Sequence, residues 1–139
     1  MDSAHKSKSG LTRIGRALRY SLQGFAAAWR NEHAFRQELM LCLVLLPFAL
    51  FLPLQILERV MLIATLFIVL VVELLNSAIE AVVDRVSLDN HDLSKRAKDL
   101  GSAAVFLSLV IAGMTWVLIA APAIVRLFQE WGRIPEHRP

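Results

Sequence analysis

Four polar residues recur every three or four positions within an apolar stretch of the chain: Glu73, Asn76, Glu80 and Asp84. At about 100° per residue, this spacing places all four on one side of a helix. Glu73 and Glu80 are then two turns apart, about 10.5 Å along the helix axis. An ionisable side chain within a membrane helix is costly and indicates a functional site. Two carboxylates that repel each other are best explained by a cation between them, such as Mg²⁺, which takes carboxylate, water and phosphate oxygens.

The alternative is that these polar groups only hold neighbouring helices together. That role explains Asn76, but a second acid on the same side adds repulsion rather than adhesion. A further acid, Glu32, precedes the first apolar run and is a candidate ligand for the same metal, although a solvated carboxylate at a helix end is the alternative. The sequence has neither a G-x-x-x-x-G-K-[ST] nor a G-x-G-x-x-G motif, so neither a P-loop nor a Rossmann nucleotide site is expected.

The composition places these acids in a membrane protein. The chain has 139 residues, of which 56% are hydrophobic and 19% charged, and its single cysteine excludes an internal disulfide. Residues 39–57 and 101–125 carry no charge, and residues 60–84 form a third apolar stretch that ends in the acidic stripe. About 20 apolar residues cross a bilayer. We therefore expect an all-α membrane protein with three transmembrane helices, at about 38–57, 60–84 and 100–125.

The connections and charges set the topology. Only Glu58 and Arg59 separate the first two uncharged runs, which predicts a tight turn there, with Pro53 breaking the first helix. Eleven Lys and Arg residues lie in residues 1–38 and 84–99, against four on the other side. By the positive-inside rule, the N-terminus and the second loop are expected in the cytoplasm and the C-terminus outside. One integral-membrane domain is expected over residues 1–139, with a C-terminal tail at 126–139.

Residues 11–30 predict an amphipathic surface helix. Apolar residues from Leu11 to Trp29 recur at spacings of three and four, and basic residues lie opposite them. A basic amphipathic helix with aromatic residues on its apolar side is typical of the membrane interface. Packing on a partner protein is the alternative. Nucleic-acid binding is not expected, because the basic residues are few and the rest of the chain is apolar.

The residues just described resemble the small bacterial integral-membrane diacylglycerol kinases. The resemblance rests on residues 73–85 (ELLNSAIEAVVDR), on residues 27–38 around Glu32, and on residues 96–105. It implies a lipid kinase of the bacterial inner membrane that recycles diacylglycerol into phospholipid synthesis, and a homotrimer with active sites shared between subunits. The substrates would be ATP and 1,2-diacyl-sn-glycerol, with Mg²⁺ required.

The resemblance also implies roles for single residues. Glu73 would be the general base, with Asn76 orienting it, and Glu32 and Glu80 would hold Mg²⁺ on the ATP phosphates. The implied ATP contacts also include Arg13, Tyr20, Lys98 and Asp99, with Asp89, Asn90 and His91 near the base or ribose. The implied lipid contacts are Arg13, Ala34, Phe35, Glu73 and Ser102.

Two other functions are considered. An undecaprenol kinase would share the acidic signature and the mechanism, but residues 34–38 (AFRQE) favour the diacylglycerol branch. A small membrane scaffold or proton-coupled carrier would use the glutamates without Mg²⁺ or ATP. Lipid-dependent release of ADP distinguishes the kinases from this non-enzyme.

Overall fold

The computed structural model describes residues 10–86 and 91–132, and within these ranges all regular structure is helical. The four helices are α1 (Gly10–Asn31), α2 (His33–Phe51), α3 (Ile56–Val86) and α4 (Asp92–Trp131). Helices α2, α3 and α4 are each long and apolar enough to cross a membrane. The predicted all-α fold, with three spans and an N-terminal helix, is confirmed. Asp89 and Asn90 lie outside the described residues.

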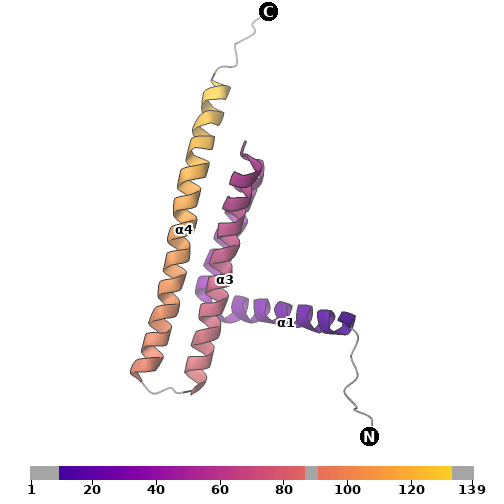
Figure 1. Ribbon diagram of the computed structural model, residues 1–139, viewed down its shortest axis with the longest axis vertical. Helices are drawn as coiled ribbons and strands as arrows, with labels where there is room; N and C mark the ends of the chain where they lie inside the picture. The colour runs from indigo at the N-terminus through magenta and orange to yellow at the C-terminus, as the bar shows by residue number, and fades with distance from the viewer. Residues whose placement is uncertain (1–9, 87–90, 133–139) are drawn as a thin grey trace, which may run out of the picture.

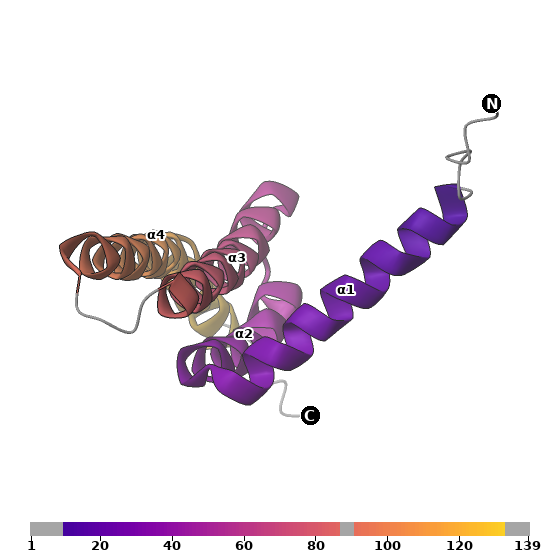
Figure 2. The ribbon, with the colours of Figure 1, turned by 90° about the horizontal axis from the view of Figure 1, so that it is seen from below.

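The three long helices form a bundle from which α1 projects (Figure 1). Helix α3 lies in the middle and packs against both α2 and α4. Seen along the bundle, α1 leaves the end of α2 and extends away from the other helices (Figure 2). Its apolar residues Ile14, Leu18, Leu22 and Phe25 are at least half exposed. Within the described chain, α1 therefore has an apolar face that the bundle does not cover.

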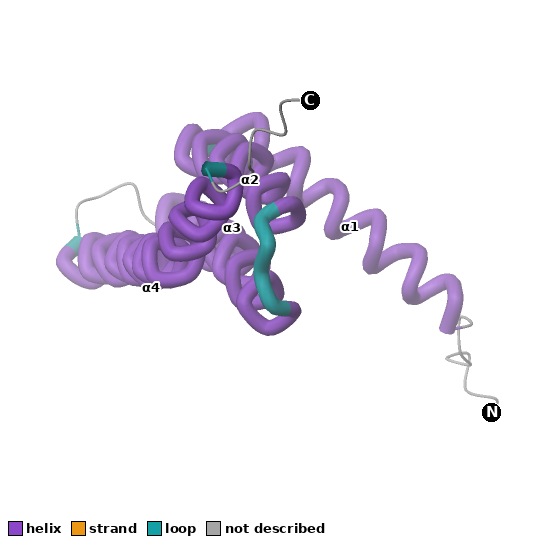
Figure 3. The backbone as a smooth tube through the Cα atoms, turned by 90° about the horizontal axis from the view of Figure 1, so that it is seen from above, coloured by secondary structure: helices purple, strands orange, loops and turns teal. Residues whose placement is uncertain are grey.

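The turn between α2 and α3 lies earlier than the charges predicted (Figure 3). Helix α2 ends at Phe51, because Pro53 disfavours helical geometry at the residue before it, and Leu52 is extended at φ −62° and ψ 146°. Glu58 and Arg59, the expected turn, instead lie in the first turn of α3, which begins at Ile56.

The two charged residues at the start of α3 stabilise this turn. Arg59 donates hydrogen bonds to the carbonyl oxygens of Ala49 (3.2 Å) and Leu52 (3.3 Å) at the end of α2. The Leu52 oxygen also accepts a hydrogen bond of 2.8 Å from the backbone N–H of Leu54. The carboxylate of Glu58 accepts a hydrogen bond of 2.9 Å from the backbone N–H of Gln55. Arg59 therefore belongs to the fold at the end of the bundle remote from the acidic stripe.

A cluster of buried core residues lies at the same end of the bundle. Ala49 and Leu52 from the end of α2 pack with Leu62 of α3 and Ala120 of α4, and each is at most 8% exposed. Small residues allow helix backbones to approach closely in a membrane, where packing rather than the hydrophobic effect holds helices together. This core and the turn fix the three spans, whereas the acidic residues lie toward the opposite end.

Candidate active site

Glu73 is the most buried of the predicted acidic residues. Its side chain is 3% exposed, although it is a carboxylate in the middle of α3. Glu80 and Glu32 lie close enough to act on Glu73 electrostatically. Glu73 and Glu80 come from α3, and Glu32 comes from the junction of α1 and α2. The sequence predicted these three acids as one site. In the described chain Glu80 and Glu32 each lie within electrostatic range of Glu73, and the single site itself stays a prediction.

Asn76 has a different partner from the one that the family resemblance implied. Its side-chain nitrogen Nδ2 donates a hydrogen bond of 3.1 Å to Glu80 Oε1, one helical turn further along α3. The expected role was to orient Glu73, which lies three residues before it. In the described chain the hydrogen-bond partner of Asn76 is Glu80, because residues four apart on a helix lie one above the other. The amide oxygen Oδ1 is buried without a hydrogen-bond partner and faces Gly101 of α4.

Glu32 lies at a sharp corner of the chain. It is the single residue between α1 and α2, with extended backbone angles of φ −106° and ψ 115°. Arg36 fixes the corner, since its guanidinium donates to the carbonyl oxygens of Trp29 (2.9 Å) and Arg30 (3.2 Å) at the end of α1. The half-buried Glu32 carboxylate is thus held at the point where the projecting helix meets the first span.

Sequence reasoning gave no role to Glu38, one of the buried acids. Its side chain is 8% exposed, one carboxyl oxygen has no hydrogen-bond partner, and it interacts electrostatically with Glu73. It lies six residues after Glu32, at the end of the polar start of α2 and directly before the uncharged run that begins at residue 39. An acid at the edge of an apolar run was the signal that could have found it. Of the residues expected to contact lipid, Phe35 is buried at 2% exposure, while Ala34 and Ser102 are exposed.

The residues expected to contact ATP are spread over three elements. Lys98 of α4 forms an ion pair with Asp84 of α3, with 2.5 Å between Nζ and Oδ1. Lys98 precedes the uncharged part of α4, and the hydrogen bond that it donates to Asp84 raises the pKa of its ammonium group. His91 caps α4, where its Nδ1 accepts a hydrogen bond of 3.2 Å from the N–H of Leu93. Asp99 is exposed beside them.

The remaining predicted ATP contacts lie on α1, away from this end of α4. Tyr20 is 66% exposed, and the side chain of Arg13 is also exposed. Arg13 lies 19 positions before Glu32, and the helix between them is continuous. At 1.5 Å per residue, about 28 Å separates the two along α1. One chain therefore does not gather all of the predicted ATP contacts in one place.

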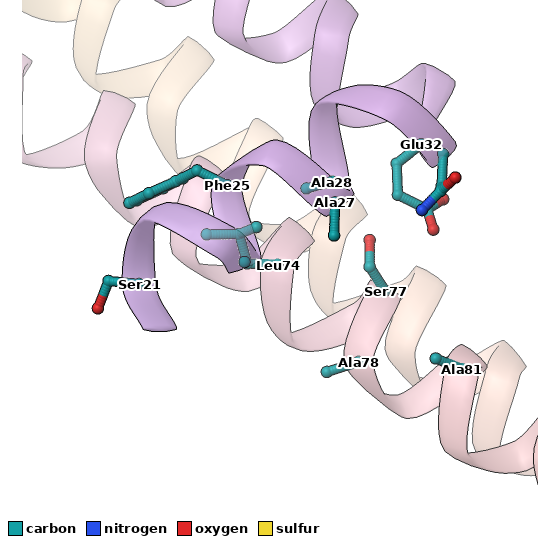
Figure 4. A pocket seen from close by; sticks show the side chains of 11 residues that line it. Ser21, Phe25, Ala27, Ala28, Glu32, Leu74, Ser77, Ala78 and Ala81 are labelled. Atoms are coloured by element: carbon teal, nitrogen blue, oxygen red, sulfur yellow. The ribbon is translucent and has the colours of Figure 1, made fainter. Parts of the chain in front are cut away.

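A cleft of about 490 Å³ separates α1 from α3 (Figure 4). Small residues of both helices line it, including Gly24, Ala27, Ala78 and Ala81, and Glu32 lies at one end. The Ser77 side chain points toward α1, and its hydroxyl is buried without a partner. Glu73, Asn76 and Glu80 do not line the cleft. Ser77 lies on the α1 side of α3, whereas Asn76 lies against Gly101 of α4.

The donor atoms present are suited to Mg²⁺ with a phosphate ligand. Within residues 10–86 and 91–132, no three His, Cys, Asp or Glu side chains are grouped closely enough to hold a metal ion alone. Mg²⁺ in phosphoryl-transfer sites uses one or two carboxylates and completes its shell with water and substrate phosphates. Glu80, held by Asn76, and Glu32 supply carboxylate oxygens of this type, so the residues fit a metal bound together with ATP.

Comparison with known proteins decides the family. The model of the prokaryotic diacylglycerol kinase family matches residues 19–120. The chain belongs to this family. It is 54% identical over 117 residues to a diacylglycerol kinase of Pseudomonas aeruginosa, covering 84% of this chain and 95% of the relative. It is 49% identical over 111 residues to that of Escherichia coli K12, covering 80% and 91%.

Membership of the diacylglycerol kinase family confirms the resemblance on which the site was predicted. A relative in Haemophilus influenzae, also named diacylglycerol kinase, is 46% identical over 108 residues, which cover 78% of this chain and 92% of that one. The matched residues 19–120 include the acids of the site and the Lys98–Asp84 ion pair. A lipid kinase is therefore favoured over a scaffold or carrier, and the diacylglycerol branch over the undecaprenol branch.

Proposed function

We propose that this kinase transfers the γ-phosphate of ATP to the primary hydroxyl of 1,2-diacyl-sn-glycerol at the cluster of Glu73, Asn76 and Glu80, giving phosphatidate and ADP. The observation that carries this assignment is the buried Glu73 carboxylate beside the Asn76–Glu80 hydrogen bond. A charged stripe within a membrane helix is costly unless it is functional. The product returns diacylglycerol to phospholipid synthesis.

Each acid has a distinct proposed role. Glu73 is the general base that takes the proton of the lipid hydroxyl, since a base must lie at the point where the lipid and ATP meet. Glu80 and Glu32 hold Mg²⁺, which when bound neutralises charge on the ATP phosphates. Lys98 and Asp99 contact ATP at the start of α4, and Ser102 contacts the lipid.

We also propose that the active site is completed by a neighbouring copy in a homotrimer. Arg13 and Glu32 are about 28 Å apart along a straight helix, so a nucleotide held at Glu32 lies almost the length of α1 from Arg13 of the same chain. If both residues contact ATP, Arg13 and Tyr20 serve the site of another copy. The projection of α1 away from its own bundle supports this arrangement (Figure 2).

The proposed location is the bacterial inner membrane, with the N-terminus and the loop before α4 in the cytoplasm and the C-terminus in the periplasm. The excess of Lys and Arg on the proposed cytoplasmic side supports this orientation. Helix α1 lies in the headgroup plane in this proposal. Its exposed Leu18, Leu22 and Phe25 support that location, since these apolar side chains find no core in the bundle.

The proposal is tested by ADP release from the purified protein in mixed micelles. With MgATP, we expect steady turnover with diacylglycerol, none without lipid, and none after Mg²⁺ is removed with EDTA. Turnover with undecaprenol and none with diacylglycerol would overturn the substrate assignment while keeping the chemistry. No turnover with either lipid would overturn the kinase assignment of the site.

A further inference from the structure

Helices α3 and α4 approach closely where Gly101 lies opposite Asn76. Gly101 is buried, and a Cβ atom added to it would overlap Asn76 Oδ1 and lie 3.2 Å from Asn76 Cγ. A real Cβ contact is seldom so short, and the overlapping atom belongs to a short, buried amide. The side chain of Asn76 therefore occupies the volume that any larger residue at position 101 would need.

The Asn76 amide has only one chemically favourable orientation in this position. Its Nδ2 donates to Glu80 Oε1 at 3.1 Å, and its Oδ1 is buried with no conventional partner. The reversed amide would place Oδ1 against the Glu80 carboxylate, where two acceptors repel each other. The oxygen must therefore face Gly101, where the Cα–H group offers at most a weak hydrogen bond.

We propose that Gly101 is a positioning residue for Glu80. Because it has no side chain, it leaves room for Asn76 to turn its amide nitrogen toward Glu80 and fix that carboxylate. Gly101 itself contacts neither ATP nor lipid in this proposal and acts only through Asn76. The effect on the reaction rests on the proposed function, in which Glu80 helps to hold the metal of MgATP.

The chain supplies a matched control on the same helix. Gly113 is also in α4, but a Cβ added there would meet no atom within 4 Å. Gly→Ala favours the helix by a similar amount at both positions. The two substitutions differ in the contact with Asn76, so a comparison of them separates positioning from the general effect of losing a glycine.

The kinetic test is a double-mutant cycle between Gly101 and Asn76. We expect Gly101→Ala to raise KM for MgATP about 10-fold, the scale of one hydrogen bond to a charged group, with a smaller change in kcat. Gly113→Ala should leave both constants unchanged. In an Asn76→Ala background, Gly101→Ala should add no further loss, because the shorter side chain leaves room for the methyl group. A normal KM in Gly101→Ala, or additive losses in the double variant, would overturn the proposal.

A second readout does not depend on catalysis. The side-chain amide signal of Asn76 in the NMR spectrum is identified by its loss in Asn76→Ala. This signal should shift in Gly101→Ala and in Glu80→Gln and stay in place in Gly113→Ala. An unmoved signal in Gly101→Ala would overturn the contact. Because the signal needs no turnover, an inactive wild-type protein would contradict the proposed function without deciding this test.

Failure of Gly101→Ala to fold is also informative. The Gly101→Ala/Asn76→Ala double variant removes the overlap and should then recover folded protein, measured as monodisperse protein in detergent. If the double variant also fails to fold while Gly113→Ala folds, the glycine serves helix packing in general, and the positioning role is wrong.

Discussion

The ammonium group of Lys98 lies 2.5 Å from the carboxylate of Asp84, so one ion pair joins the last turns of α3 to the second turn of α4. The hydrogen bond with Asp84 raises the pKa of Lys98. A cation whose pKa is raised in the folded state contributes its full stabilisation below its unfolded pKa, about 10.4 for lysine, and loses it only at higher pH. Lys98 therefore carries its charge throughout the neutral range.

Lys98→Met should raise KM for MgATP more than Asp84→Asn does. The first substitution removes a cation that we assign to the phosphates, whereas the second removes only the group that holds it, in a pair that is half exposed and therefore weak. Lys95→Met, at an exposed position on the same helix, is the control and should leave KM unchanged. Equal losses in Lys98→Met and Asp84→Asn would contradict a direct contact between Lys98 and ATP. Initial rates at varied MgATP make the comparison.

Glu73→Gln should lower kcat by about 100-fold or more, because it removes the general base. MgATP binding should stay largely intact, because the proposed metal ligands are unchanged. Glu80→Gln and Glu32→Gln should instead weaken MgATP binding. Equilibrium binding of nucleotide, measured beside turnover, separates the two effects. Glu58→Gln, at the other end of α3, is the control. Near-normal turnover in Glu73→Gln would show that the base is another residue.

Arg59→Met should lower the thermal stability of the protein without changing KM for either substrate. The substitution removes two hydrogen bonds from a charged donor to the end of α2, each worth about 1.5–3 kcal/mol at most. Thermal unfolding in detergent measures the loss, and Arg126→Met at an exposed position of α4 is the control. An unchanged midpoint temperature would mean that the turn does not depend on Arg59.

Glu38→Leu should raise the midpoint temperature of unfolding. One carboxyl oxygen of Glu38 is buried without a partner, and such a group costs about 1–3 kcal/mol relative to an apolar side chain. Leucine fills similar space among the apolar residues that line the 140 Å³ cavity beside Glu38, which include Leu45 and Leu66. Glu130→Leu, at an exposed position, should have little effect. A lower midpoint in Glu38→Leu would show that the carboxyl group is held by a partner after all.

The three spans were predictable because the length of an uncharged run of residues shows whether a helix can cross a bilayer. The end of α2 was predicted only in part: Pro53 was expected to break the first helix, but the span was drawn to residue 57. The uncharged run continues to Leu57, whereas the helix ends at Phe51 because of backbone restriction at Leu52. The apolar run depends on side-chain hydrophobicity, whereas the helix end depends on backbone geometry. A run of apolar residues therefore predicts a membrane segment better than it predicts where the helix ends.

The part of the acidic site that lies on a single helix, α3, was predictable from the sequence. The three-and-four spacing placed Glu73, Asn76 and Glu80 together, and the same spacing would have given Glu80 as the partner of Asn76. The contact of Gly101 with Asn76 depends on how α3 and α4 are aligned, and these residues are far apart in the sequence. No local pattern fixes that alignment, so the glycine was passed over.

The lengths of the spans differ, and this gives α2 a particular place in the membrane. Its 19 residues extend for about 28 Å, close to the roughly 30 Å of a hydrocarbon core, whereas α4 has 40 residues and about 60 Å. Helix α4 is long enough to cross a thicker bilayer. Helix α2 is not, because Glu32 alone joins it to α1 and residues 52–55 join it to α3. Because α2 is no longer than the hydrocarbon core, a change in bilayer thickness should shift the depth of Glu32, which lies directly before α2. Turnover in vesicles should fall as the acyl chains of the host phosphatidylcholine lengthen, because a thicker core draws Glu32 away from the water that carries ATP.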